Sequence, residues 1–166
     1  GGFCTKGLSL MPMAGNPPGR IAETPSGMLN AIGLENIGTE EFIREKLPQL
    51  ERYECHVIAN IFGKSIDEFI RITERLNPHA KVSAYELNIS CPNIKEGGVS
   101  FGNDPDMSAR VVEACRASTS KPLIAKLSPN QTDIRENARR CIEAGSDALA
   151  VINTVMGSSN PSIKNP

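Results

Sequence analysis

The chain has 166 residues, of which 22% are charged and 39% are hydrophobic, and its formal net charge is −1 at neutral pH. This balance gives no electrostatic reason to expect nucleic acid or an anionic membrane surface as a partner. No apolar run approaches the roughly 20 residues that a membrane-spanning helix needs, so a membrane protein is not predicted either.

The first fifty residues mix one strand-like start with turn signals. Residues 1–5 read as a strand already under way. The Gly/Pro-rich stretch at residues 11–27 is too short and too mixed for a low-complexity linker. The acidic segment at residues 35–45 predicts the N-terminus of a helix, because the helix dipole favours negative charge there.

Four later apolar runs are strand-like, and each delivers a polar side chain at its end. Runs this continuous suit strands that are covered on both faces, as in a parallel sheet. The carboxyl ends of parallel strands meet at one rim, where α/β proteins bind ligands. The runs cover residues 55–60, 82–87, 122–126 and 147–153, and the polar side chains are those of Asn60, Asn88, Lys126 and Asn153.

Helices with readable starts lie between these runs. Ser65 and Glu68 have the spacing of a capping box. Asp104 precedes a proline, as an N-cap often does, and predicts a helix to about residue 117. Asp133 opens a third helix that Gly145 closes. The resulting alternation of strands and helices predicts βαβ units around a parallel sheet.

The length limits what this sheet can be. A complete eight-stranded barrel typically needs roughly 250 residues, and the pattern supplies only four to five βα units. Either the fold is a small open sheet, or the chain is a piece of a longer polypeptide. We favour the piece, and we expect residues 1–166 to form a single domain.

Cys91 is the most informative single residue. It lies in a loop just past the strand-like run 82–87, between Asn88 and Asn93. A thiol whose pKa is near ambient pH serves as a base and then as an acid, so a catalytic role is preferred over an inert cysteine. The five cysteines are odd in number and lack C-x-x-C spacing, which fits reduced thiols in the cytoplasm.

Several motifs together resemble the dihydroorotate dehydrogenases, and they extend from Thr5 to about Thr154. The match looks closest to the class 1B catalytic subunit, the branch that uses NAD through a second subunit. Beyond Thr154 the sequence departs from the pattern expected of the family. The motifs are TKGLS (5–9), GNPPGR (15–20), ETPSGMLNAIGLEN (23–36), NISCPN (88–93), KLSPN (126–130) and INT (152–154).

The resemblance implies a fold and a reaction. The fold is a TIM (β/α)8 barrel that binds FMN, of which this chain would cover roughly strands 2 to 6. The phosphate site of FMN would lie outside this chain. The reaction is the oxidation of dihydroorotate to orotate in pyrimidine biosynthesis, with Cys91 as the catalytic base and hydride transfer to FMN.

The resemblance also implies the binding residues. Lys126 matches the lysine beside the flavin N1 and O2 region, and Lys6 matches a lysine close to both flavin and substrate. No metal site is implied. The positions matched to cofactor binding are Lys6, Gly7, Asn60, Asn88, Lys126 and Ile152. Those matched to substrate binding are Lys6, Asn30, Ala31, Ile32, Gly33, Leu34, Asn88, Asn93, Asn153 and Thr154.

The implied partners are dihydroorotate or orotate and an electron-transfer subunit that carries FAD and an iron–sulfur cluster, in a homodimer or heterotetramer. The sequence leaves the final electron acceptor open between NAD and fumarate. Two alternatives also stay open. One is another flavin TIM-barrel pyrimidine oxidoreductase, of the dihydropyrimidine dehydrogenase or dihydrouridine synthase type. The other is a non-catalytic fragment that only binds a partner.

Overall fold

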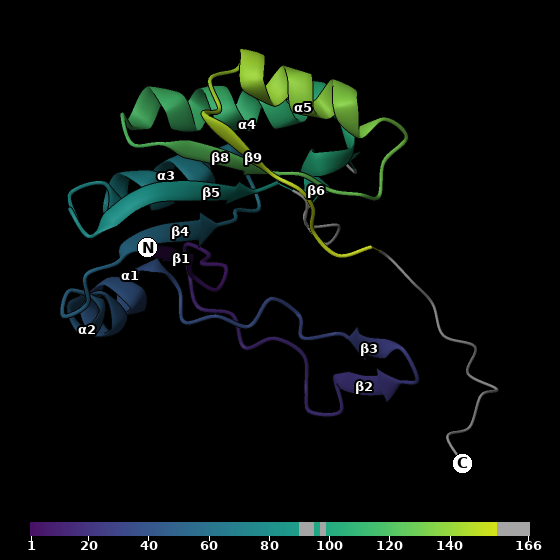
Figure 1. The fold of residues 1–166 in the computed structure, drawn as a ribbon, viewed down its shortest axis with the longest axis horizontal. Coiled ribbons are helices and arrows are strands. Elements are labelled where there is room, and N and C mark those ends of the chain that lie inside the picture. The colour runs from purple at the N-terminus through teal and green to yellow at the C-terminus, as the bar shows by residue number, and fades with distance from the viewer. Residues whose placement is uncertain (90–94, 97–98, 156–166) are drawn as a thin grey trace.

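The computed structural model describes residues 1–89, 95–96 and 99–155 of the chain (Figure 1). Its centre is a five-stranded sheet in the order β1-β4-β5-β8-β9, in which all neighbouring strands are parallel. Strands follow one another across the sheet in chain order, as in a (β/α) barrel and unlike the reversing order of a doubly wound sheet. The strands are β1 Gly2–Cys4, β4 His56–Ile61, β5 Val82–Asn88, β8 Leu123–Lys126 and β9 Ala148–Ala150.

Three helices connect these strands and confirm the predicted βα alternation. They are α3 Ile66–Leu76, α4 Pro105–Ser118 and α5 Ile134–Glu143. Ser65, Asp104 and Asp133 are their N-caps, and each side chain accepts a backbone N–H from the first turn. Gly145, with φ of 103°, follows the end of α5, as predicted.

The two faces of the sheet differ in chemistry. Alternate residues point toward the helices and are buried in one hydrophobic core. Tyr85 is among them, and its hydroxyl donates to the carbonyl of Thr73 at 3.3 Å. Core residues on the strands include Val57, Ala59, Ile61, Tyr85, Leu87, Leu123 and Ala125. The other face carries polar side chains near the strand ends, and it corresponds to the inside of a barrel.

A bent helical segment packs beside the β1 edge of the sheet (Figure 1). It runs from α1 Thr39–Glu41 through a π-helical turn, Phe42–Lys46, into α2 Leu47–Leu50. Two glutamates of the predicted acidic segment lie in its first turn, as expected. Glu35 lies before the helix instead and forms an ion pair with Arg20.

A two-stranded arm extends away from the sheet (Figure 1). Its antiparallel strands are β2 Ile21–Thr24 and β3 Gly27–Asn30. The turn signals in this part of the sequence do not predict these strands, because the strands are short and lie among glycines and prolines. A second short hairpin joins β6 Lys95–Glu96 to β7 Val99–Ser100, followed by the 3-10 turn Phe101–Asn103.

One predicted strand is shorter than expected. The run at residues 147–153 forms strand only over Ala148–Ala150. Asn153 therefore lies beyond the strand, although its backbone N–H still donates to Leu127 O at 3.0 Å. Within the part of the chain that the structure describes, no helix is long and apolar enough to cross a membrane.

Candidate functional site at the carboxyl rim of the sheet

Four polar side chains share the open face of the sheet near its carboxyl rim. Asn60 of β4 is the cross-strand partner of Glu86 in β5, and Asn88 of β5 is the partner of Lys126 in β8. Cross-strand partners point to the same side of a sheet, as do residues two apart on one strand. The alternation that buries Leu87 and Ala125 against the helices therefore turns these four toward one region.

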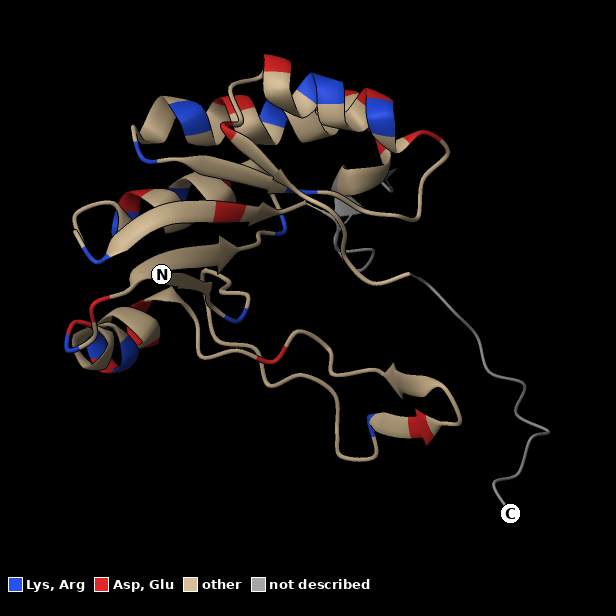
Figure 2. Cartoon of the chain, viewed as in Figure 1, with Lys and Arg blue, Asp and Glu red and all other residues tan. Residues whose placement is uncertain are grey.

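Glu86 is at the centre of this group. Its Oε1 accepts a hydrogen bond from Asn60 Nδ2 at 2.5 Å and lies 3.6 Å from Lys126 Nζ. The Glu86 side chain is 13% exposed and that of Lys126 is 28% exposed. In Figure 2 an acidic band interrupts β5, whereas most charged residues lie on helices and loops. Sequence analysis did not single out Glu86, although a carboxylate inside an apolar strand two residues before Asn88 was a usable signal.

Asn60 presents an acceptor that has no donor among the described residues. The residue is only 4% exposed, and its Oδ1 is buried without a hydrogen-bond partner. The orientation of the amide is fixed, because Nδ2 must face the Glu86 carboxylate. An unsatisfied buried acceptor costs about 1–3 kcal/mol, so a bound group that brings a donor would recover stability here.

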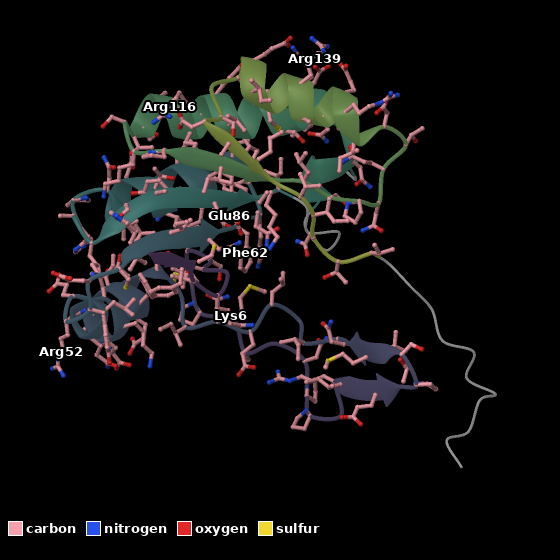
Figure 3. The ribbon with its side chains drawn as sticks, viewed as in Figure 1. Lys6, Arg52, Phe62, Glu86, Arg116 and Arg139 are labelled. Carbon is pink, nitrogen blue, oxygen red and sulfur yellow. The ribbon has the colours of Figure 1, made fainter. Side chains whose placement is uncertain are left out.

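The loop after β1 lies beside this acceptor. Leu8 N donates to Asn60 O at 2.9 Å and Phe62 N donates to Leu8 O at 3.0 Å, so the loop is fixed along β4. A Cβ on Gly7 would lie 3.1 Å from Asn60 Oδ1 and 3.2 Å from the Phe62 ring. Lys6 precedes Gly7 and is exposed, and Figure 3 shows it at the same end of the sheet as Phe62. The structure thus brings Lys6 and Gly7 to the rim, and their binding roles stay a prediction.

Two further predicted amides meet across the rim. Asn153 Nδ2 donates to Asn88 Oδ1 at 3.0 Å. The Oδ1 of Asn153 accepts the backbone N–H of Thr154 at 2.7 Å, and Asn130 Nδ2 donates to Thr154 O at 2.9 Å. Ile152 comes just before this pair and is exposed. The segment after β9 is therefore held against the end of β5.

The predicted residues from Asn30 to Ile32 lie on the arm rather than on the rim, whereas Leu34 packs against the hydrophobic core. The backbone N–H of Ala31 donates to Arg20 O, and Ile32 O accepts from the N–H of Asn16, so these bonds stay within the arm. Gly33 has φ of 76°, and a Cβ there would come within 2.7 Å of Asn16 N. Leu34 also has positive φ, at 60°. The prediction that residues 30–34 contact the substrate at the rim stays untested by this arrangement.

The catalytic prediction falls outside the described residues. Both Cys91 and Asn93 belong to the segment that follows the described part of β5. Asn88, which sequence analysis placed just before the loop, is the last residue of β5. The strand before Cys91 ends at the rim, as predicted. The role of Cys91 itself stays a prediction.

Cys4 is a second residue that sequence analysis missed. It lies on the edge strand β1, where the residue as a whole is exposed. Partial burial of the thiol, followed by the charge of the nearby Glu86 carboxylate, raises the pKa of Cys4 to about 12. The thiol is therefore protonated at neutral pH, and it is not a nucleophile there.

These features define a class of protein. A parallel βα sheet that presents amides and a lysine on its inner face, near the carboxyl rim, is part of a (β/α) barrel with a ligand site at that rim. Among the described residues no cluster of three or more His, Cys, Asp or Glu could hold a metal ion. Residues 1–165 match the family model described as dihydroorotate dehydrogenase, and the chain belongs to that family.

Curated relatives agree with this membership. The chain is 57% identical to the catalytic subunit of dihydroorotate dehydrogenase B (NAD(+)) of Trichlorobacter lovleyi, over 95% of this chain and 52% of that protein. It is 54% identical to the protein of the same name in Pelobacter propionicus, over 95% and 52%. It is 49% identical to the putative dihydroorotate dehydrogenase A (fumarate) of Aquifex aeolicus, over 95% and 51%.

The chain spans about half the length of these relatives. The family fold is a TIM barrel, and the five parallel strands form a partial one, as predicted. The family is in general flavin-dependent. The family match extends to residue 165, beyond the last recognised motif near Thr154, and the alignments to the curated relatives cover 157 residues.

Proposed function

We propose that this chain is part of an FMN-dependent dihydroorotate dehydrogenase that oxidises dihydroorotate to orotate in pyrimidine biosynthesis. The family membership supports the reaction class. The single observation that carries the site assignment is the arrangement at the rim, where the unsatisfied acceptor of Asn60 and the ammonium of Lys126 both adjoin Glu86. This arrangement suits a ligand that brings a hydrogen-bond donor and accumulates negative charge.

FMN fits these requirements. The cofactor supplies hydride acceptance at its isoalloxazine ring, which has an imide N–H donor and gains negative charge on reduction. Lys126 provides a fixed ammonium that stabilises this charge without reorganisation. Asn60 offers its acceptor, and the absence of a side chain at Gly7 lets the backbone approach Asn60 and the Phe62 ring closely. The remaining residues proposed to hold the cofactor are Lys6, Asn88 and Ile152.

The substrate is proposed to bind through side-chain amides. Orotate has imide N–H and C=O groups together with a carboxylate, and a carboxamide carries both a donor and an acceptor. Asn88 and Asn153 are already adjacent, and Thr154 is bonded to Asn153. Asn30 and Asn93, the segment 31–34 and the ammonium of Lys6 complete the proposed set.

Cys91 is proposed to move the proton. Dihydroorotate loses a proton from C5 and a hydride from C6, and the hydride goes to FMN. Cys91 takes the C5 proton into its thiolate and becomes a neutral thiol, so charge and atoms balance. A cysteine suits this work because its ordinary pKa, about 8.5, is lowered readily by nearby cations and dipoles.

We also propose the NAD-linked class, with a cytoplasmic location and a second subunit that carries FAD and an iron–sulfur cluster. The identity of 57% to a catalytic subunit named for NAD(+), against 49% to one named for fumarate, favours this class. A homodimer of the catalytic chain or a heterotetramer with the partner is the expected assembly.

A comparison of substrates and acceptors in the full-length protein tests this function. The purified protein should carry FMN and oxidise dihydroorotate, with dihydrouracil turned over far more slowly. Reduction of NAD should require the co-expressed second subunit, and fumarate should be a poor acceptor. Preference for dihydrouracil would favour the related flavin barrels instead. A protein that takes up no FMN would indicate a non-catalytic chain.

A further inference from the structure

We propose that Glu86 is a positioning residue that partly offsets the charge of Lys126 and thereby lowers the reduction potential of the bound FMN. This inference rests on the proposed function, because it assumes that Lys126 faces the flavin. It goes further by assigning a role to a carboxylate that is placed among the cofactor residues without being one of them.

The first support is the geometry around one oxygen atom. Glu86 Oε1 is 2.5 Å from Asn60 Nδ2 and 3.6 Å from Lys126 Nζ. Side chains from β4 and β8 thus converge on Glu86 of β5, and both are proposed cofactor contacts. Displacement of Glu86 would release both Asn60 and Lys126.

The second support is the burial of the pair. Glu86 is 13% exposed, so water screens its charge less than it would on the surface. A carboxylate 3.6 Å from an ammonium cancels much of the field that the ammonium projects onto a neighbouring ligand. Reduced flavin is the more negative state, so this cancellation favours the oxidised flavin. Glu86 therefore weakens the positive field that Lys126 alone would project onto the flavin.

The sign of the effect follows directly. Glu86→Gln removes the negative charge but keeps a carbonyl oxygen that can accept from Asn60 Nδ2. Lys126 is then unopposed, reduced flavin is stabilised, and the potential rises. A merely structural ion pair would change stability on this substitution, but it would leave the flavin potential where it was.

The experiment is a spectroscopic redox titration of the full-length FMN-bound protein, as wild type and as Glu86→Gln. The expected result is about a tenfold change in the oxidised-to-reduced ratio at fixed solution potential, equivalent to about 30 mV upward for a two-electron couple. Glu113→Gln is the matched control, because Glu113 is an exposed residue of α4. Its potential should equal that of the wild type.

A second comparison covers the case in which Glu86→Gln does not fold or hold FMN. Replacement of both members of a buried ion pair by neutral groups is often tolerated. The double variant Glu86→Gln/Lys126→Gln should therefore fold. Its flavin potential should lie above that of Lys126→Gln alone, because it lacks the negative charge of Glu86. Equal potentials in that comparison, or an unchanged potential in Glu86→Gln with FMN retained, would overturn the inference and leave the proposed function standing. A wild-type protein without FMN would overturn both.

Discussion

Asn153 donates a hydrogen bond from its Nδ2 to Oδ1 of Asn88 at 3.0 Å, which links two amides 65 positions apart in the sequence. The contact joins the end of β5 to the segment after β9, across the end of β8. Both side chains were predicted to bind substrate, and they reach this position from opposite sides of Lys126. The carboxyl rim therefore assembles its polar groups even though the described residues form five strands of a barrel rather than eight.

Replacement of Asn153 should weaken pyrimidine binding. Asn153→Ala in the full-length enzyme removes a carboxamide together with its hydrogen bonds to Asn88 and Thr154. A polar group of orotate left without its partner costs about 1–3 kcal/mol, which corresponds to roughly a 5- to 150-fold loss of orotate affinity. Orotate titration of the flavin spectrum measures it.

Asn77→Ala is the matched control for this prediction. Asn77 caps the end of α3 and its Oδ1 accepts from Thr119, at the opposite end of the sheet from the rim. It should leave orotate affinity unchanged. Equal losses in the two variants would mean that Asn153 acts only through the stability of the fold.

Cys91→Ser should separate binding from chemistry. The variant should keep FMN and orotate but slow the reduction of flavin by dihydroorotate by about 10²–10⁴-fold, the usual loss without general-base catalysis. Part of the rate should return at higher pH, because a hydroxyl is a far weaker acid than a thiol. Rapid-mixing kinetics under anaerobic conditions measure the step, and an unchanged rate at neutral pH would remove Cys91 from its assigned role.

The two lysines should behave differently. Lys126→Ala should weaken FMN retention or make the flavin harder to reduce, because the ammonium near the reduced ring is lost. Lys6→Ala should act mainly on pyrimidine turnover, since Lys6 is exposed on the loop after β1. FMN content, flavin potential and steady-state kinetics of both variants check this. Identical flavin potentials in wild type and Lys126→Ala would exclude the electrostatic role.

Cys4 should be unreactive for a measurable reason. Burial and the Glu86 carboxylate raise its pKa to about 12, and the thiolate is the form that reacts. At pH 8 its alkylation by iodoacetamide should be about 10²–10³-fold slower than in the unfolded protein. Glu86→Gln should speed it, because one of the causes of the raised pKa is removed. Peptide mass spectrometry reads the rate, and rapid labelling of Cys4 in the folded wild type would contradict this placement.

Local signals were enough to predict the βα framework. Ser65, Asp104 and Asp133 each combine an N-cap side chain with a suitable first turn, and each begins a helix in the structure. The apolar runs that end in Asn60, Asn88 and Lys126 form neighbouring strands. Their continuous apolar composition predicts strands that are buried on both faces. Parallel pairing of these strands was enough to predict that their carboxyl ends meet at one rim.

The features that were missed depend on contacts distant in the sequence. Glu86 belongs to the site because it contacts Asn60 and Lys126, which are 26 and 40 positions away in the sequence. Only the strand register brings these residues together. The β2–β3 arm pairs exposed strands of four residues each, which carry no burial pattern to detect. The end of strand at Ala150 likewise depends on β8, because the paired register of the two strands ends at Lys126 and Ala150.

Residues 1–166 should not behave as a complete enzyme when expressed alone. Five strands cannot close an eight-stranded barrel, so the polar inner face and the outer edges of β1 and β9 would lack their neighbours. The isolated chain should bind FMN weakly, expose apolar surface and associate. Sedimentation and flavin titration test this, and a compact monomer with stoichiometric FMN would require a smaller self-sufficient fold.

The most direct test of the central claim is anaerobic addition of dihydroorotate to the full-length protein while its flavin spectrum is recorded. If the rim is the FMN and pyrimidine site of a dihydroorotate dehydrogenase, the oxidised flavin bands should bleach stoichiometrically within a single turnover, and orotate should form in equal amount. The Lys126→Ala and Asn153→Ala variants should bleach more slowly or less completely. A flavin that stays oxidised in the wild-type protein, or bleaches equally well in both variants, would show that the rim is not the FMN and pyrimidine site.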